Sequence, residues 1–503
     1  MEHQVPILAN DTGPNPMRAA LFLQPTGRVR AHTAILCVFL LFGSCALAQS
    51  APVSPDHPWH GVGEQRIEAE GKNSRESSFS IDPIKSYSLA ELIDLAETHN
   101  PETQVAWERA RAQAAALGVA RSELFPTLAA AALSQTSRQE TYLETRYYRQ
   151  TFQDFQGALD LNYMVFDFGA RAGRIDAAKA EVLAANFEFN DTHRRVIYEV
   201  EQAYYQLLNA SGQEDAARAS LSTAQVVQQS AEERLNNGLA TLPDVLEARS
   251  ATAQTEYELQ TALGAEETAQ GDLATALGTS PTATIHTETL KELPIPDSMV
   301  DSVDLAINRA FAQRPDLMGL VAEIRSSNAK VKEARAAFYP SLAVNVNPVA
   351  QSLYGLQQTL PWGHTAGLTG GLSLSLNWTV FDGGARKNNV VQAEANVRAA
   401  EAQANAARDE IANQVWAAYS NLKTAFRQRQ AAAALLQAAS QSYDSILESY
   451  NYGLRNFLDV TAAQRTLAQA RSTDVLARTQ VLIALADLAF RTGDSIQPAA
   501  RRP

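Results

Sequence analysis

Cysteine is nearly missing from this sequence: there are two, Cys37 and Cys45, and both lie within the first 48 residues. Those residues have the pattern of a targeting signal, because two arginines precede the apolar run 34–42 and the small-residue pattern Ala46-Leu47-Ala48 follows it. We therefore expect 1–48 to be a signal peptide. Cleavage after it would leave a mature chain without cysteine, which excludes disulfides and thiolate metal sites.

A lipoprotein signal is the alternative for the same segment. Gly43-Ser44-Cys45 suits cleavage before Cys45 and its lipidation, although Phe42 stands where leucine is usual. A single acyl chain binds membranes only marginally, so it would add to another anchor rather than replace one. Met17 is a second candidate for the true start.

Long hydrophobic runs are also missing beyond the signal. No apolar stretch there approaches the ~18 residues that a transmembrane helix needs. If the mature chain enters a membrane, it must therefore do so with β-strands closed into a barrel.

The motifs of enzymes are missing as well. The sequence has no P-loop, dinucleotide fingerprint, paired-histidine zinc motif or nucleophile elbow, so no enzyme, cofactor or metal is expected. Only five methionines occur, and two of them precede the expected cleavage site, which argues against a route for soft metal ions. The net charge is −13 without basic clusters, so nucleic acid is not an expected partner.

What the sequence does contain is an internal duplication, in which motifs recur at an offset of 214 or 215 residues. The paired segments are 100–102 with 314–316, 124–128 with 338–342, 165–171 with 380–386, 237–239 with 452–454, and 276–278 with 491–493. Because the offset hardly changes, the two halves share one structural plan.

Each half begins with an Ala-rich helix and continues with two strands. The helices are predicted over about 89–124 and 303–338, and an aromatic-proline pair ends each of them. Strands are predicted from Thr127 and over 159–165, 342–346 and 372–380. Their strict apolar–polar alternation fits strands with lipid on one face and water on the other, and a soluble sandwich with one wet face is the alternative. Four strands cannot close a barrel alone, so a barrel requires several copies of the chain.

A very long helix follows the strands of each half, over about 169–236 and 384–452. Roughly 68 residues at ~1.5 Å each give about 100 Å. Small apolar residues step by four, three and four along both helices, which predicts a tightly packed coiled-coil seam. The seam residues are Val196, Val200, Ala203 and Leu207, and Ile411, Val415, Ala418 and Leu422. Glycine turns then lead into second helices, about 243–277 and 458–490.

These patterns divide the chain into six parts. They are a signal peptide (1–48), a loose periplasmic N-terminal segment (49–86), a first repeat (87–278), a linker (279–300), a second repeat (301–493) and a short tail (494–503).

The order and doubling of these elements resemble the TolC-like outer membrane efflux protein family, over residues 86 to 494. Phe-Asp-x-Gly at 166–169 and 381–384 and the Gly-Leu turns at 238–239 and 453–454 carry the resemblance. It implies an α+β membrane protein of the bacterial outer membrane that forms a homotrimer. Three protomers would close a twelve-stranded β-barrel in outer-membrane lipid, continued by a periplasmic α-helical coiled-coil barrel. The family also implies two partners, a periplasmic adaptor protein and an inner-membrane pump.

The resemblance also implies functional residues at the helix tips. A periplasmic gate would consist of Asp244, Tyr450, Arg455 and Asp459, closed by Tyr–Asp and Arg–Asp contacts. The family's second gate carboxylate falls on Ala462 here, so the acidic ring would be single. The adaptor would contact Gly238, Leu239, Ala240 and Thr241, and Gly453, Leu454, Arg455 and Asn456. Helix capping alone would also explain glycines and aspartates at these places.

The function predicted on this basis is a passive exit duct across the outer membrane, for a tripartite efflux system or for type I protein secretion. The alternative is an exported coiled-coil scaffold or adhesin without a pore. A scaffold would wash off membranes in high salt, whereas a barrel would need detergent.

Overall fold

The computed structural model describes residues 64–73, 81–82, 85–143, 146–290, 295, 302–357 and 363–494. The chain separates into two units, residues 1–77 and 78–503. The signal peptide 1–48, Cys45 and the tail beyond residue 494 lie outside the described residues.

In the first unit the described part is a helix, α2 (Glu64–Asn73). The expectation of a loose segment over 49–86 is wrong at this point. Glutamate, glutamine, arginine and alanine dominate α2, and these residues favour helix. Arg66 and Glu70 add an ion pair one turn apart, with Nε 3.0 Å from Oε1.

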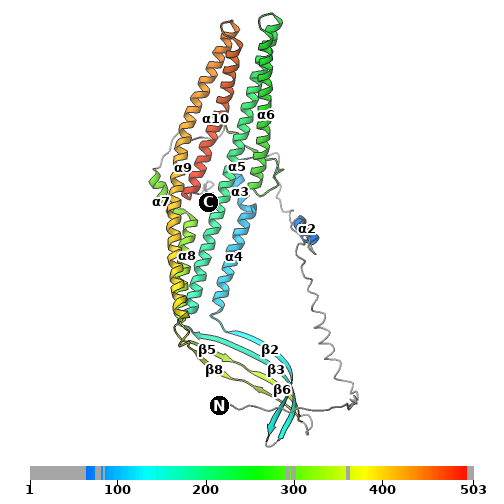
Figure 1. Cartoon of the computed structure of the whole chain (residues 1–503), viewed down its shortest axis with the longest axis vertical. Helices are drawn as coiled ribbons and strands as arrows, with labels where there is room; N and C mark the ends of the chain where they lie inside the picture. The colour runs from blue at the N-terminus through cyan, green and yellow to red at the C-terminus, as the bar shows by residue number, and fades with distance from the viewer. Residues whose placement is uncertain are drawn as a thin grey trace, which may run out of the picture. The chain divides into compact units, whose positions relative to one another are not determined.

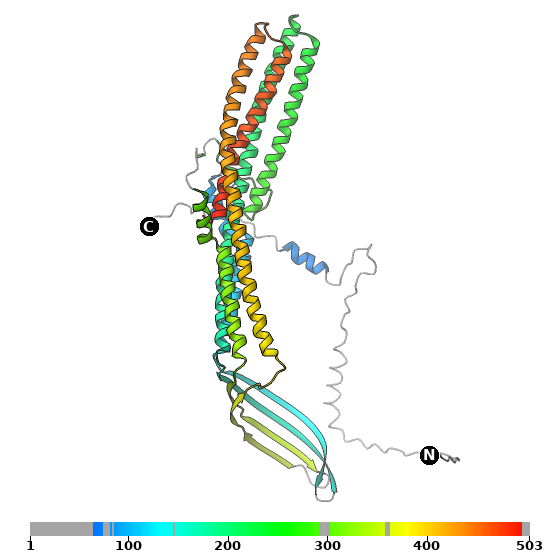
Figure 2. The same cartoon turned by 60° about the vertical axis from the view of Figure 1, so that its left-hand side comes forward.

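The second unit is built from two similar halves. The first half contains β1 (Ser86–Tyr87), α3 (Leu89–His99), α4 (Pro101–Ser122), β2 (Thr127–Leu143), β3 (Arg146–Phe166), α5 (Ala170–Asn236) and α6 (Leu242–Ala276). The second contains β4 (His286–Thr287), α7 (Val303–Gln313), α8 (Pro315–Ala336), β5 (Ser341–Val346), β6 (Val349–Gln357), β7 (Gly363–Thr369), β8 (Leu372–Asn377), α9 (Ala385–Asn451) and α10 (Phe457–Thr492). The sheet of β2, β3 and β5 to β8 lies at one end of this unit and the paired tips of the long helices at the other (Figures 1 and 2).

The prediction of one continuous helix at the start of each half is wrong, because Pro101 and Pro315 divide it in two. The residue before each proline is extended, with ψ of 127° at Asn100 and 120° at Arg314. Asn100 then caps the second helix, since its side chain accepts a hydrogen bond from the amide of Glu102 at 2.7 Å.

Helices α6 and α10 end next to these breaks at Pro101 and Pro315. The repeated glycine motif after each of these helices therefore lies against the repeated proline motif of the same half. Gly278 follows α6 with a φ of +78°, and the side chain of Asn100 donates to the carbonyl of Ala276 at 2.9 Å. A Cβ on Gly278 would lie 2.9 Å from Cδ of Pro101. In the second half, Gly493 has a φ of +84°, and a Cβ there would lie 3.2 Å from the backbone nitrogen of Arg314. The glycine is required by its backbone conformation and by the close approach.

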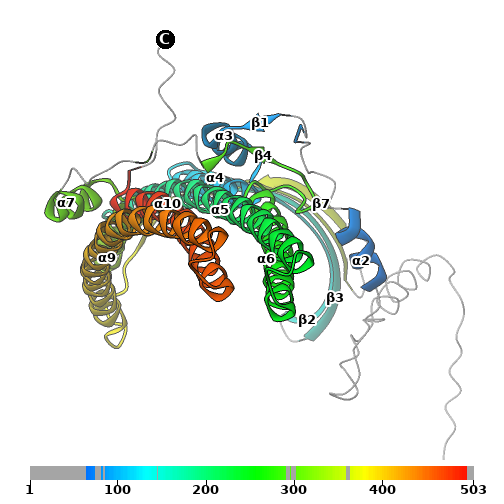
Figure 3. The same ribbon diagram turned by 90° about the horizontal axis from the view of Figure 1, so that it is seen from above.

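The long helices α5 and α9 begin and end close to where the sequence predicts. All eight seam residues are buried, which confirms the predicted packing stripe. Seen from above, α9, α10, α5 and α6 stand side by side along an arc (Figure 3). Among the described residues, no helix combines the length and the apolar character that crossing a membrane requires.

Among the described residues, the sheet contains four strand paths, which are β2, β3, β5 followed by β6, and β7 followed by β8. β3 is central: it pairs antiparallel with β2 along one edge and with β5 and β6 along the other, and β8 and β7 pair with β5 and β6. The third and fourth paths are interrupted at Pro348 and at Gly370–Gly371. Proline lacks the amide donor of a ladder, but Leu159 still donates to the carbonyl of Pro348 at 3.0 Å, so the third path follows β3 across the break. The predicted strand over 372–380 is too long, because β8 ends at Asn377 and the indole of Trp378 donates to the carbonyl of Phe338 at 3.1 Å.

The two faces of the sheet differ as the alternation predicts. Cross-strand partners share a face, and the register places Leu161, Val346 and Leu372 together on the apolar one. On the other face, Asn162 donates to the side chain of Asn345 at 2.7 Å, which donates to Oγ of Ser375 at 3.2 Å. A polar ladder therefore crosses three strands on one face while aliphatic side chains cover the other.

Candidate functional site

Two tight turns join the long helices at their tips, one at Gly238 after α5 and one at Gly453 after α9. Both glycines have positive φ, +72° and +75°, and each amide donates to the carbonyl three residues earlier at 2.9 Å. This is the glycine cap that the sequence predicts. The side chains of Leu239 and Leu454 are 69% and 78% exposed, so each turn presents one leucine to the solvent.

The residues after the turns start α6 and α10 in different ways. The amide and hydroxyl of Thr241 donate to Oδ2 of Asp244 at 2.9 and 2.8 Å. In the second half, Oδ1 of Asn456 accepts from the amide of Asp459 at 2.8 Å. The Asp244 carboxylate therefore belongs to the cap of α6, whereas Oδ2 of Asp459 faces Nη1 of Arg455 at 3.6 Å.

Of the four residues of the predicted gate, the structure brings Arg455 and Asp459 together directly. The ring of Tyr450 is buried, with its centre 5.8 Å from that of Phe457 in an edge-to-face arrangement. Burial raises the pKa of Tyr450; the positive charge of Arg234 opposes this effect, and the negative charge of Asp244 adds to it. The hydroxyl is therefore neutral at physiological pH. That these residues form a gate stays a prediction.

Sequence reasoning missed a further residue at this place, Arg234 in the last turn of α5. Its guanidinium carbon lies 4.4 Å from the centre of the Tyr450 ring. The available signal was the repeat itself, because the equivalent position in the second half is the small, uncharged Ser449.

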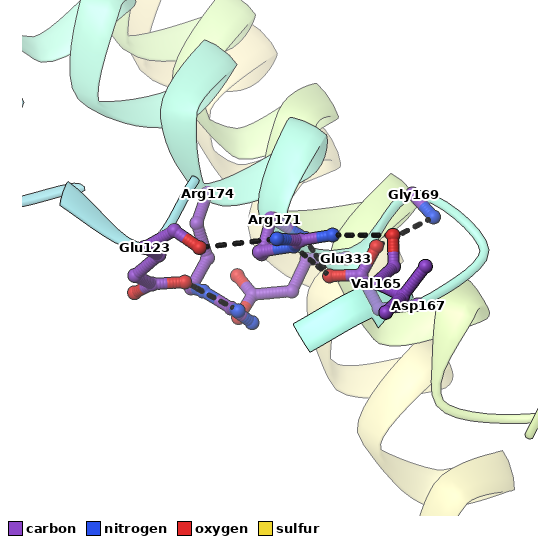
Figure 4. Close-up of polar contacts among 7 residues, drawn as sticks. All are labelled: Glu123, Val165, Asp167, Gly169, Arg171, Arg174 and Glu333. Carbon is purple, nitrogen blue, oxygen red and sulfur yellow. Dashed lines mark hydrogen bonds and ion pairs between the residues drawn. The ribbon is translucent and has the colours of Figure 1, made fainter. Parts of the chain in front are cut away.

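A second cluster of polar contacts holds the junction between the sheet and the long helices (Figure 4). In the first half, Nε of Arg171 donates to Oδ2 of Asp167 at 3.1 Å, and its two terminal nitrogens donate to the carbonyls of Glu123 and Val165 at 3.1 and 3.3 Å. Asp167 also accepts from the amide of Gly169 at 3.3 Å. One arginine thereby joins the end of α4, the end of β3 and the start of α5.

The second half repeats this junction. Nε of Arg386 donates to Oδ2 of Asp382 at 2.6 Å, and Asp382 also accepts from the amide of Gly384 at 3.0 Å. The shared Asp-x-Gly-Ala-Arg sequence therefore encodes a structural turn, which explains the strong repetition of this motif.

Arg174 connects the two halves at the same level (Figure 4). Its guanidinium lies 2.6 Å from Oε2 of Glu123 and 3.3 Å from Oε1 of Glu333 on α8. The helices approach closely here, since a Cβ on Gly173 would lie 2.8 Å from the backbone nitrogen of Glu333. In the part of the chain that the structure describes, no group of three or more His, Cys, Asp or Glu residues could hold a metal ion.

Comparison with known proteins identifies the family. The model of the outer membrane efflux protein family matches residues 92–279 and 306–494. Protein CyaE of Bordetella pertussis is 28% identical over 407 residues, which cover 80% of this chain and 82% of CyaE. Outer membrane protein OprJ of Pseudomonas aeruginosa is 26% identical over 468 residues, covering 90% and 93% of the two chains. The crystal structure of the Campylobacter jejuni CmeC outer membrane channel has a TM-score of 0.68 at 20% identity, over 90% of this chain and 96% of CmeC.

The family model matches twice, once in each half, as an internal duplication requires. The TolC-like α+β fold with its internal repeat, the outer-membrane location and the function as an outer-membrane export duct are confirmed. With its two halves and nearly all of its helical and sheet structure matched, this chain belongs to the outer membrane efflux protein family.

Proposed function

We propose that three copies of this chain close a twelve-stranded barrel in the outer membrane and continue it as a helical tunnel into the periplasm. Such a duct would conduct passively the substrates that a periplasmic adaptor and an inner-membrane pump deliver, in drug efflux or in type I secretion. It would catalyse no reaction.

The observation that carries this proposal is that the sheet of one protomer has unpaired edge strands. Within the described residues, β2 pairs only with β3, and β7 and β8 pair only with β6 and β5. Each protomer therefore has two free edges, of which the 17-residue β2 is one. Long unpaired edges are a liability that closure into a barrel removes. Four strand paths from each of three chains supply twelve strands.

The exposure of apolar side chains on the sheet supports a lipid-facing surface. Leu372, Leu374 and Leu376 of β8 are 76%, 66% and 64% exposed, and they share one face. A protein in water would cover such a stripe, whereas a transmembrane strand presents it to lipid. The polar ladder of Asn162 and Asn345 would then face the water-filled interior.

The residues at the helix tips support the proposed adaptor contact and the proposed gate. Leu239 and Leu454 are exposed apolar side chains at the ends of the coils, suited to pack against a partner helix. Around the axis of a trimer, three copies of Asp459 would form an acidic constriction that attracts cations. The pair of Arg455 and Asp459 would help to hold this constriction closed.

Fractionation and electrical recording test the proposal together. The chain should stay in the membrane fraction after a high-salt wash, require detergent for extraction, purify as a trimer and conduct ions in planar bilayers. A scaffold or adhesin without a pore would wash off in salt. A purified, detergent-free monomer with its sheet intact would contradict the proposed barrel.

Replacing Arg455 with alanine should raise the conductance of the resting channel. An exposed pair one turn apart contributes about 0.3–0.5 kcal/mol, so its loss in three copies would shift the closed-to-open ratio by about fivefold to twelvefold. Single-channel recording of purified trimers measures this. Lys179→Ala is the control, because it removes a comparable ion pair, Nζ to Asp176 at 3.0 Å, at the other end of α5. An identical closed-state conductance of wild type and Arg455→Ala would remove this pair from the gate.

A further inference from the structure

Arg234 connects the tip of the first coil, formed by α5 and α6, with the tip of the second coil, formed by α9 and α10. Besides lying 4.4 Å over the ring of Tyr450, it donates from Nη1 to the carbonyl oxygen of Tyr450 at 3.4 Å. Arg234 belongs to α5 and Tyr450 to α9, so these contacts join residues 216 positions apart in sequence. A single side chain thus holds both the ring and the backbone of the same residue.

The carbonyl that Arg234 contacts is part of the tip turn. It also accepts the amide of Gly453 at 2.9 Å, the hydrogen bond that closes the turn after α9. The ring of Tyr450 also packs edge-to-face against Phe457, the first residue of α10. A displacement of the second coil relative to the first would therefore have to break the contacts of Arg234.

The environment of the guanidinium makes the ring its main partner. Arg234 is half-buried, and its Nε is shielded from solvent without an acceptor among the described residues. A shielded donor without an acceptor is costly, and the electron-rich face of an aromatic ring offsets part of that cost. Removing the ring would leave this cation poorly compensated.

The contact between an arginine of one tip and a tyrosine of the other occurs once per protomer and is not repeated with the two halves exchanged. At the positions of Arg234 and Tyr450, the other half of the repeat has Ser449 and Leu235 respectively. A serine is too short to reach across the coils, and a leucine offers no π face to a cation. The contact is therefore specific to one pairing of tips, that of the first coil holding the second.

We propose that Arg234 is a further gating residue, which holds the second coil of each protomer in the closed position by clamping Tyr450. The inference rests on the proposed function, in that the tips must form the closed end of the duct. It adds a residue of the first repeat to a gate otherwise located mainly in the second.

Recordings of the Arg234→Gln trimer in planar bilayers test the inference. The closed-to-open ratio should fall by about fivefold per protomer, which corresponds to ~1 kcal/mol of cation–π energy at 1.4 kcal/mol per tenfold. Arg234→Lys keeps a cation over the ring and should restore most of the closed state. Arg234→Met retains the apolar stem of the side chain and should lower the closed-to-open ratio as Arg234→Gln does. It replaces Arg234→Gln in the recordings if that variant yields no trimer.

The same substitution in a Tyr450→Leu background separates a clamp from a general effect of the charge. A clamp requires that the effect of Arg234→Gln becomes clearly smaller once the ring is gone, because only the weaker contact with the carbonyl of Tyr450 remains. A cation in the last turn of a helix also stabilises the helix dipole, and that role alone would give equal effects in both backgrounds and overturn the inference. Arg249→Gln is the matched control, because Arg249 pairs with Glu232 within the first coil at 2.9 Å.

The outcomes also distinguish the inference from the gate itself. Unchanged conductance in Arg234→Gln trimers overturns the role of Arg234 in every case. If Arg455→Ala still opens the channel, the proposed gate stands without Arg234. If neither variant changes the conductance, the tips are not the closed end of the duct and both proposals fail.

Discussion

Replacing Gly278 with alanine should destabilise the protein by about 3 kcal/mol. The residue has a φ of +78°, which an L-side chain adopts only with strain, and an added Cβ would lie 2.9 Å from Cδ of Pro101 and 3.1 Å from Cα of Asn100. Both atoms belong to the rigid break between α3 and α4, so neither can move away cheaply. The thermal unfolding midpoint of the detergent-solubilised protein, followed by circular dichroism, should fall by several degrees.

The same substitution at a glycine within α6 provides the control. Gly264 lies within the helix, and nothing lies within 4 Å of an added Cβ. Gly264→Ala should therefore stabilise the protein by about 0.5–1 kcal/mol, because alanine restricts the unfolded chain and favours helix. If both variants shifted the midpoint in the same direction, the close approach at Gly278 would not be what requires glycine there.

The meeting of Gly278 with Asn100 shows what the sequence could and could not reveal. The repeat marked both motifs as important, because each recurs at the same offset in the second half. It did not show that they touch, since contact between residues 178 positions apart depends on how the helices fold back. Only the structure explains why one motif accompanies the other.

The elements whose apolar residues recur at a regular spacing could be predicted from the sequence. The seam of Val196, Val200 and Leu207 follows helical spacing, and burial of these residues is a direct consequence of that spacing. The alternation in β8 likewise placed its leucines on one face. These patterns are local, so one sequence contains all the information that they need.

The helix and strand boundaries that were predicted wrongly lie where two local sequence signals favour different structures. Pro101 sits at a permitted first-turn position of α4, but it also forces Asn100 out of helical geometry, so the predicted single helix is two. The apolar–polar alternation in the sequence continues to Val380, but β8 ends earlier, because the chain there turns toward the Asp382–Arg386 junction. Neither outcome follows from periodicity alone.

The candidate gate was predicted through a resemblance and not through physical necessity. Asp244 and Asp459 near helix starts would be explained by capping alone, and in the structure Asp244 does bind Thr241 of its own cap. The position of Arg234 over Tyr450 could not be predicted, because the pairing of one tip with the other is a tertiary contact. Its charge in only one copy of the repeat was the sole local indication.

Replacing Leu374 with arginine should prevent most of the chain from assembling in the membrane. An arginine on the lipid-facing side of a transmembrane strand costs up to about 2–4 kcal/mol near the bilayer centre. Leu374 is 66% exposed on the apolar face, opposite Val344 in the register, so the charge would enter lipid in the proposed trimer. The ratio of folded trimer to unfolded chain should fall by about 30-fold to several hundredfold. Gel mobility of unheated outer-membrane samples measures this ratio.

Ser373→Arg places the same charge one residue earlier in the same strand. Because successive side chains of a strand alternate between faces, this arginine would project toward the polar side, where Ser373 pairs in register with Asn345. In a water-filled duct it would cost little, and its trimer yield should stay near that of the wild type. A soluble sandwich would bury one face of the sheet in its own core and leave the other in water, and it would form without any membrane. Equal yields for Leu374→Arg and Ser373→Arg would mean that neither face meets lipid, and the sheet would then need a different partner to cover its leucines.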